Sequence, residues 1–259
     1  MDSRTHLADG THTTPCFISV PSTDLTTPKG MGTQALFGQR FDLISSENGM
    51  AHGALYSIVP GKDRIDYVGT VSSDAVSDAP HAPTHCVPAL SAAIFKQPDI
   101  KSRLMGSLPR NAVMVGHAQG DFLHLHGSGY IHLKHLRPIQ DASARMFTEL
   151  AKDMLGLPYI WGGTGHIGVD CSGLVQSALA ATGVDAPRDA DQQEASLGRS
   201  VSDGKRQIGD LLFWPGHVGI VIEGDKLLHA NAHHMCVAIE SVAQAVSRIG
   251  DVRTVKRLT

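Results

Sequence analysis

The sequence predicts two small all-β barrels followed by an α+β domain. Up to residue 139 the chain shows short apolar runs separated by turn residues, a pattern typical of barrels of about 50 to 60 residues. After Pro138 two segments with helical spacing come first and apolar strands follow, which is the order of an α+β domain. We therefore expect barrels at 31–80 and 84–139 and an α+β domain at 140–259.

Residues 1–30 are rich in Thr, Ser, Asp and Pro and show little periodicity, so we predict a leader there that is either mobile or draped over another domain. Apolar runs predict the strands of the first barrel at 36–37, 41–44 and 67–71. Turns are expected at 47–49 and 60–62, and a linker at 72–83. The strands of the second barrel are expected at 85–87, 112–115, 122–125 and 130–133.

The α+β domain begins with two predicted helices. Apolar residues at helical spacing predict the first over 141–155, where Gly156 and Pro158 end it. The second is expected over 172–182, with Gly183 as its C-terminal stop. Strands are then expected at 210–214, 217–223, 226–230 and 236–239.

Composition excludes several classes of partner. The net charge of −3 provides no basic surface, so no nucleic-acid partner is expected. No apolar run approaches the roughly 18 residues that a membrane span needs. The first sixteen residues are polar, and the four cysteines show no C-x-x-C spacing. We therefore expect no Sec signal peptide and a cytoplasmic protein with reduced thiols, with export by a non-Sec route as the alternative.

Cys171 is the candidate nucleophile. It lies in Asp-Cys-Ser-Gly at 170–173, directly before a predicted helix. A thiol at a helix N-terminus feels the positive end of the macrodipole, which favours the thiolate. The alternative is a structural cysteine, because most free cysteines behave as small buried hydrophobic residues.

Two downstream histidines are candidates for the base and its partner. His217 opens an apolar strand and His229 lies in the next one. A two-residue turn would pair Glu223 with Lys226 and place the histidines on opposite faces, because side chains alternate along a strand. A three-residue loop at 224–226 places both on one face, and such loops commonly contain Gly. We predict the three-residue loop and a Cys-His-His group.

Five segments together resemble the NlpC-type cell-wall peptidases. They are Tyr-Ile-Trp-Gly-Gly at 159–163, Asp-Cys-Ser-Gly-Leu-Val at 170–175, Gly-Asp-Leu-Leu-Phe at 209–213, His-Val-Gly-Ile at 217–220 and Leu-His-Ala at 228–230. The resemblance implies an α+β papain-like catalytic domain preceded by two small all-β SH3-like barrels. Such barrels often carry Tyr-Gly-Glu and Trp-x-Trp, where this sequence has Phe-Gly-Gln at 37–39 and Met-Ala-His at 50–52.

The resemblance also implies the reaction. Family members cut the γ-D-glutamyl–diamino acid bond of peptidoglycan peptides. Cys171 would attack the γ-glutamyl carbonyl, His217 would form the ion pair and protonate the leaving amine, and His229 would orient His217. The Tyr159 hydroxyl would join the Cys171 backbone N–H in stabilising the oxyanion. No metal and no cofactor are expected.

Four further residues are candidates for substrate binding. In relatives that digest short peptides, the positions of Asp170 and Ser172 hold the free amine of an N-terminal L-alanine. A blocked amine would then leave the Asp170 carboxylate buried and unpaired. The two barrels would close one end of the cleft. Trp161 and Asp189 match segments that line the same cleft. The alternatives are a helix N-cap for Asp170, core packing for Trp161 and a solvated loop position for Asp189.

We predict a peptidase that acts on free L-Ala-γ-D-Glu-diamino acid peptides in cell-wall recycling. One alternative is a lysin or effector that acts on intact peptidoglycan after export. Another is a non-catalytic wall-binding protein, which an intact Cys-His-His group argues against. A zinc site is a further alternative, since histidines and a cysteine cluster at 229–236, but their spacing matches no closed tetrahedral motif.

Overall fold

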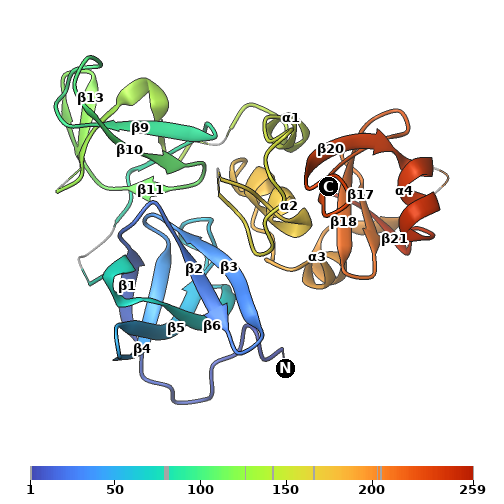
Figure 1. Ribbon diagram of the computed structural model, residues 1–259, viewed down its shortest axis with the longest axis horizontal. Coiled ribbons are helices and arrows are strands. Elements are labelled where there is room, and N and C mark those ends of the chain that lie inside the picture. Colours follow the sequence, from blue (N-terminus) through green and yellow to red (C-terminus); the bar gives the residue numbers. More distant parts are fainter. Residues whose placement is uncertain are drawn as a thin grey trace. The chain divides into compact units, whose positions relative to one another are not determined.

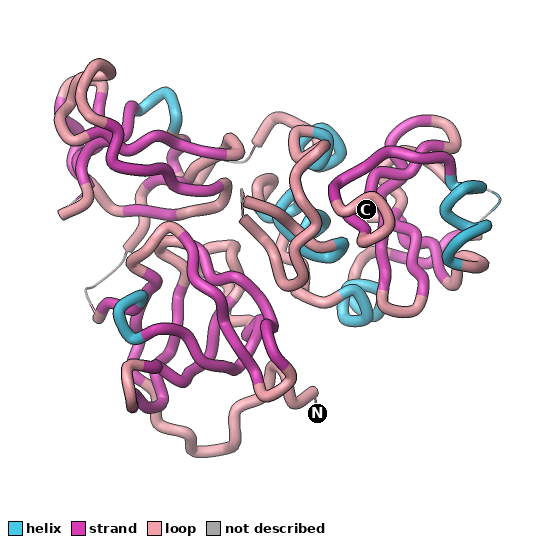
Figure 2. The backbone as a smooth tube through the Cα atoms, viewed as in Figure 1, coloured by secondary structure: helices cyan, strands magenta, loops and turns pink. Residues whose placement is uncertain are grey.

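The chain forms two compact units, Met1–Ser143 and Ala144–Thr259, each described here by itself. The computed structural model describes residues 2–78, 82–125, 127–141, 143–165, 167–202, 204 and 206–258. Within these residues the first unit consists of strands and two short 3-10 turns, and the second holds the α-helices (Figures 1 and 2).

The first part of the N-terminal unit is a seven-stranded antiparallel sheet of order β3-β2-β6-β5-β4-β1-β7. Its strands are β1 (Thr14–Ile18), β2 (Ser22–Thr27), β3 (Gly30–Leu36), β4 (Arg40–Glu47), β5 (Met50–Tyr56), β6 (Ile65–Ser72) and β7 (Val76–Ser77). Its core includes Ile18, Leu25, Phe41, Leu55 and Val71. The expected turn between β4 and β5 is confirmed, with Asn48 and Gly49 at φ values of 51° and 77°.

The predicted leader is wrong for residues 14–30. β1 pairs with β4 and β7, and β2 pairs with β3 and β6. Ile18 and Leu25 are buried although most of their neighbours are polar, because each strand turns only alternate residues towards the core. The predicted linker is also partly structured, since the 3-10 turn η1 (Ser73–Ala75) and β7 lie within it. Residues 79–81 of that linker lie outside the described residues.

The second part of the N-terminal unit has a core of its own, which includes Val87, Ile94, Leu108, Leu123 and Ile131. It contains β8 (His85–Cys86), β9 (Ser91–Phe95), β10 (Leu104–Pro109), β11 (Val113–Met114), β12 (His117–Gln119), β13 (Phe122–Leu125), β14 (Gly129–His132), the 3-10 turn η2 (Leu133–His135) and β15 (Arg137–Pro138). The strand orders are β10-β9-β14-β13-β12 and β11-β8-β15. The all-β character is confirmed, while the SH3-like identity of both parts stays a prediction.

Gln39 is a structural residue of the first sheet. Its side chain is buried, accepts the backbone N–H of Leu36 at 2.9 Å and donates to the backbone carbonyl of Tyr56 at 2.6 Å. The amide therefore fastens the β3–β4 corner to β5, which accounts for a buried polar side chain at this position.

The C-terminal unit combines four helices with a six-stranded antiparallel sheet. The helices are α1 (Phe147–Lys152), α2 (Cys171–Ala180), α3 (Ala190–Ser196) and α4 (Val242–Ile249). The strands are β16 (Arg199–Val201), β17 (Leu211–Trp214), β18 (His217–Glu223), β19 (Lys226–Asn231), β20 (Cys236–Ser241) and β21 (Thr254–Arg257), in the order β16-β21-β17-β18-β19-β20. The predicted order of helices before strands is confirmed for α1, α2 and β17 to β20.

The helices α2 and α4 lie on either side of this sheet (Figure 1). Every residue from Cys171 to Leu179 is buried, so α2 is a central helix rather than an amphipathic surface helix. On the α4 side the core includes Leu212, Val221, Leu227 and Ala245. In the described parts of the chain, each helix is too short or too polar to cross a membrane.

Candidate active site

The first residue of α2 is Cys171, and its thiol lies against the beginning of β18. Sγ is 4.0 Å from the carbonyl oxygen of Gly216, and the backbone N–H of Val218 donates a hydrogen bond to the sulfur. Both neighbours of His217 therefore contact the thiol. The four cysteines of the chain are unpaired in the described structure.

The two histidines are joined directly. Nε2 of His217 lies 2.8 Å from Nδ1 of His229, a hydrogen-bond distance. His229 is completely buried, so this contact is shielded from water. Since its Nε2 is engaged by His229, His217 has only Nδ1 left for the thiol proton. The predicted pairing of His217 with His229 is thus present, while the roles of nucleophile, base and orienting residue stay predictions.

The hairpin of β18 and β19 brings the histidines together by a route that the sequence did not predict. Its turn has two residues, since Glu223 pairs with Lys226. One step further Val221 pairs with Leu227, so Ile222 is an extra residue, a β-bulge. The bulge reverses the alternation that a regular two-residue hairpin would impose. The shared face is confirmed, and the predicted three-residue loop is wrong.

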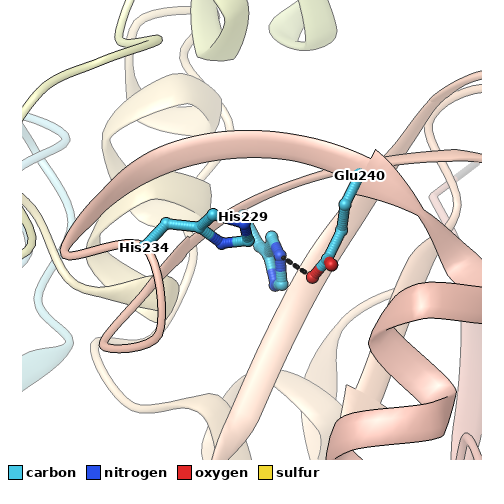
Figure 3. Close-up of side chains that lie close together, drawn as sticks. All are labelled: His229, His234 and Glu240. Carbon is cyan, nitrogen blue, oxygen red and sulfur yellow. Dashed lines mark ion pairs between the residues drawn. The ribbon is translucent and has the colours of Figure 1, made fainter.

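A carboxylate faces the ring nitrogen of His229 that does not contact His217, and the sequence analysis did not predict it. Glu240 of β20 places Oε1 2.8 Å from Nε2 of His229 (Figure 3). Arg248 of α4 donates to both oxygens of Glu240, with Nη1 3.0 Å from Oε2. A continuous set of contacts thus joins His217, His229, Glu240 and Arg248, beside the Cys171 thiol. The hydrophobicity of these residues predicts the wrong burial here, because the charged Glu240 is buried while the apolar Ile239 beside it is 38% exposed.

Burial controls the charge of the nucleophile and the base. It raises the pKa of Cys171 from 9.0 to about 11, with the Asp170 carboxylate adding to the effect and the Val218 N–H opposing it. Burial lowers the pKa of His217 from 6.5 to about 4. Both groups are therefore neutral near neutral pH in the free enzyme. The expectation that the helix N-terminus favours a thiolate is outweighed by burial.

Asp170 caps α2 and is held entirely by protein donors. Its carboxylate accepts the backbone N–H groups of Gly173 at 2.7 Å and Gly162 at 2.9 Å. Arg188, only 1% exposed, donates to both of its oxygens at 3.0 and 2.7 Å and to the hydroxyl of Ser172 at 2.9 Å. The N-cap interpretation of Asp170 is confirmed. The argument that a blocked substrate amine would leave Asp170 unpaired is wrong, because Arg188 already neutralises it.

The other predicted residues occupy different surroundings. Burial and the nearby charges of Cys171 and Asp170 raise the pKa of Tyr159 to about 12, so its phenol stays protonated and can donate. Trp161 is 69% exposed, so the core-packing alternative is wrong. Asp189 is the N-cap residue of α3, and its backbone N–H donates to the side chain of Gln192 at 3.3 Å. Substrate contacts of Trp161 and Asp189 stay predictions.

The structure brings only some of the candidate zinc ligands at 229–236 together within its described residues. Ligand atoms of His229, His234 and Glu240 lie within 4.8 Å of one another (Figure 3). However, His217 engages Nδ1 of His229, and Arg248 donates to the same Glu240 oxygen that faces Nε2 of His229. A guanidinium on that oxygen opposes a cation there. We therefore assign these residues to the histidine pair.

Known proteins share both the sequence motifs and the fold. Residues 156–252 match the sequence model of the NlpC/P60 family. The chain is 28% identical over 239 residues to gamma-D-glutamyl-L-lysine dipeptidyl-peptidase of Bacillus subtilis (strain 168), covering 86% of this chain and 79% of that protein. It is 37% identical over 83 residues to dipeptidyl-peptidase 6 of Lysinibacillus sphaericus, covering 32% of this chain and 31% of that protein.

A solved structure extends the likeness to both units. The crystal structure of an NlpC/P60 family protein from Bacillus cereus ATCC 10987 superimposes with a TM-score of 0.78 at 20% identity, covering 94% of this chain and 99% of that one. It shows that the fold is shared. The family match spans Cys171, His217 and His229 in the predicted order. Residues 156–252 therefore form an NlpC/P60 domain of papain-like fold, and the chain carries the cysteine-peptidase domain of that family.

Proposed function

We propose that the chain hydrolyses the bond between γ-D-glutamate and a diamino acid in short peptides derived from peptidoglycan. The observation that carries the proposal is the pair of imidazoles, 2.8 Å apart, together with the Cys171 thiol that contacts both neighbours of His217. The substrate class is supported by the relative named gamma-D-glutamyl-L-lysine dipeptidyl-peptidase, which aligns with most of this chain.

The reaction follows from the arrangement of these groups. Sγ of Cys171 attacks the γ-carbonyl carbon while its proton passes to Nδ1 of His217. The backbone N–H of Cys171, at the first position of α2, has no partner within the helix and donates to the oxyanion with the Tyr159 hydroxyl. The C–N bond breaks and the leaving amine takes the proton from His217. Water, deprotonated by His217, then hydrolyses the thioester and restores the thiol.

As part of the same proposal, the preferred substrate carries a free N-terminal L-alanine. Because Arg188 compensates Asp170, we expect only a moderate penalty for a blocked amine, on the order of 10-fold in kcat/KM. Incubation with L-Ala-γ-D-Glu-meso-diaminopimelate and with the L-lysine peptide, followed by product mass, tests the bond and the diamino acid. The N-acetylated peptide tests the free end.

The same assay separates thiol from metal chemistry. We expect the Cys171→Ala variant and iodoacetamide-treated enzyme to release no product, and EDTA to leave the rate unchanged. Loss of activity with EDTA but not with iodoacetamide would contradict the proposal.

A second candidate is a lysin or effector peptidase that acts on intact peptidoglycan. It is favoured by the 34% identity over 129 residues to peptidoglycan endopeptidase RipB of Mycobacterium tuberculosis, which covers 53% of that protein. Murein sacculi cut as fast as the free peptide would favour it. The first proposal places the enzyme in the cytoplasm, which cell fractionation tests.

A further inference from the structure

Glu240 lies on the side of His229 that faces away from His217. Its side chain is 6% exposed, and Oε1 lies 2.8 Å from Nε2 of His229, which is itself 0% exposed. Arg248, which belongs to α4, donates hydrogen bonds to both carboxylate oxygens. The carboxylate therefore has a fixed position and a buried imidazole in front of it.

We propose that Glu240 is a positioning residue that sets the tautomers of both histidines and thereby leaves Nδ1 of His217 free to accept the Cys171 proton. The inference rests on the cysteine-peptidase chemistry but not on the proposed substrate.

The tautomers follow from what each atom can do. A carboxylate held by Arg248 can only accept, so Nε2 of His229 carries the proton. Neutral imidazole has one N–H, so Nδ1 of His229 is an acceptor and Nε2–H of His217 donates to it across 2.8 Å. Nδ1 of His217 is then unprotonated. This is the form that a base beside a thiol requires.

The neighbouring charges act on the protonation of the two imidazoles. Glu240 raises the pKa of His217 and of His229, while Arg248 lowers both. His234, in the turn between β19 and β20, opposes protonation of His229, and Asp170 at the start of α2 favours protonation of His217. When His217 takes the thiol proton, Glu240 stabilises the resulting imidazolium through His229.

His234 is the competing partner for His229, because its ring lies 6.5 Å from that of His229. However, Nδ1 of His234 lies 3.0 Å from the side-chain oxygen of Asn231, and His234 is exposed. A solvated ring with a partner of its own is a weaker determinant than a buried carboxylate.

The wild-type enzyme provides the first test. Imidazole ¹⁵N chemical shifts at neutral pH should report His229 as the Nε2–H tautomer and His217 as the same tautomer. An Nδ1–H signal for His229 would overturn the proposal without any variant.

Glu240→Leu provides the second test. Arg248 faces both carboxylate oxygens, and one of them also faces Nε2 of His229, so an amide could keep its oxygen on His229. Leucine removes the acceptor altogether and leaves the tautomers of both histidines unfixed. We expect a fall in kcat of about 100-fold or more with little change in KM, as for other triads that lose their orienting carboxylate. Alkylation of Cys171 by iodoacetamide, located by peptide mass with Cys236 as internal reference, should slow at least 10-fold (an order-of-magnitude expectation).

Matched variants separate positioning from stability. Glu194→Leu removes a similar Arg–carboxylate contact, with Arg253, that touches no histidine, and should leave alkylation and tautomers unchanged. His234→Ala should do the same, and Glu240→Asp should keep the wild-type tautomers. If Glu240→Leu folds and alkylates at the wild-type rate, or if His234→Ala reverses the tautomers, the proposal fails. Neither readout uses a peptide, so failure of the proposed substrate would remain a separate result.

Discussion

The charge of Asp170 is compensated inside the protein by a guanidinium that is almost completely buried. Arg188 is 1% exposed and forms two hydrogen bonds to the carboxylate. It also holds the Ser172 hydroxyl, so one side chain positions both residues that flank Cys171. Removing one member of a buried pair leaves an isolated charge, which costs about 3–5 kcal/mol.

We therefore expect Arg188→Met to lower the unfolding free energy by about 3–5 kcal/mol. Trp161 and Trp214, the two tryptophans of the chain, both belong to the C-terminal unit, so denaturant unfolding followed by fluorescence reports on this unit. Adding Asp170→Asn should restore part of the loss, because no unpaired charge then remains. Arg253→Met is the control: Arg253 is 46% exposed, and such surface pairs contribute only about 0–1 kcal/mol. Equal losses for both arginines would contradict this account.

The nucleophile and its two histidines should differ in the severity of their loss. Cys171→Ala should abolish hydrolysis with an unchanged Tm, since a small residue at the start of α2 preserves the packing. His217→Ala should be similarly severe. His229→Ala should retain more activity, because an orienting residue usually contributes less than the base that it orients. Steady-state kinetics and thermal melts of the three variants test this order. A wild-type rate for Cys171→Ala would make Cys171 a structural residue.

The sequence predicts the reacting residues well and their supports poorly. Cys171, His217 and His229 lie in short motifs with characteristic neighbours. Arg188 and Glu240 become visible only when distant segments are brought together, 18 residues from Asp170 and 11 from His229. A charged residue alone in a loop or at the end of a strand is usually solvated, so local reasoning passes over both.

At the scale of elements, the bulge at Ile222 sets the face on which His217 lies. If Ile222 were paired in the ladder instead, the two-residue turn would place His217 and His229 on opposite faces of the hairpin. A bulge inserts one unpaired residue and therefore shifts the alternation of one strand against the other. Its presence depends on packing along the whole hairpin, which is why the sequence indicated a shared face but not how it is reached.

Deleting Ile222 should preserve the histidine pair. The shortened β18 can keep Val221 paired with Leu227 and Glu223 paired with Lys226, now in a regular hairpin. Loss of a buried side chain should cost about 2–4 kcal/mol, while the folded fraction should retain kcat within about 10-fold. Unfolding curves and kcat per folded molecule provide the measurement. A folded but inactive deletion variant would show that the bulge itself positions His217.

The helices α3 and α4, which the sequence analysis did not predict, both begin with a recognisable capping motif. Ser241 and Gln244 form a capping box at the beginning of α4, with the Ser241 hydroxyl accepting the Gln244 N–H at 3.1 Å. Asp189 and Gln192 have the same spacing at α3. A search for this pattern would have found both. The first helix was predicted too long, because the chain leaves it after Lys152 and turns at Gly156, where φ is 82°.

At the scale of the whole molecule, long-range pairing explains what local patterns could not reveal. β1 and β2 were predicted to be a leader because their residues are mostly polar, yet each is hydrogen-bonded to strands from later in the chain. Strand formation depends on the partner as much as on the segment itself. The C-terminal unit was easier, since α2 and β17 to β18 bury nearly continuous apolar runs.

Buried ionisable groups should make the stability of the C-terminal unit depend on pH in two separate windows. Burial lowers the pKa of His217 and His229 from 6.5 to about 4. The unfolded chain therefore takes up these protons first, so the stabilisation is complete above pH 6.5 and is lost as pH falls towards 4. Burial raises the pKa of Cys171 from 9.0 to about 11. Its stabilisation is complete below pH 9.0 and is lost as pH rises through 11.

The histidine window can be isolated by experiment. The pKa values of Glu240 and Glu194 are lowered by their arginines from 4.5, so their stabilisation persists until pH falls below that value. Between pH 6.5 and 4.5 we expect tryptophan-monitored unfolding to lose about 2 kcal/mol per buried histidine. His229→Asn should reduce this acid loss and leave the alkaline one, whereas Cys171→Ala should remove only the alkaline loss. An unfolding free energy that stays constant between these two pH values would mean that the histidine pair is hydrated in solution.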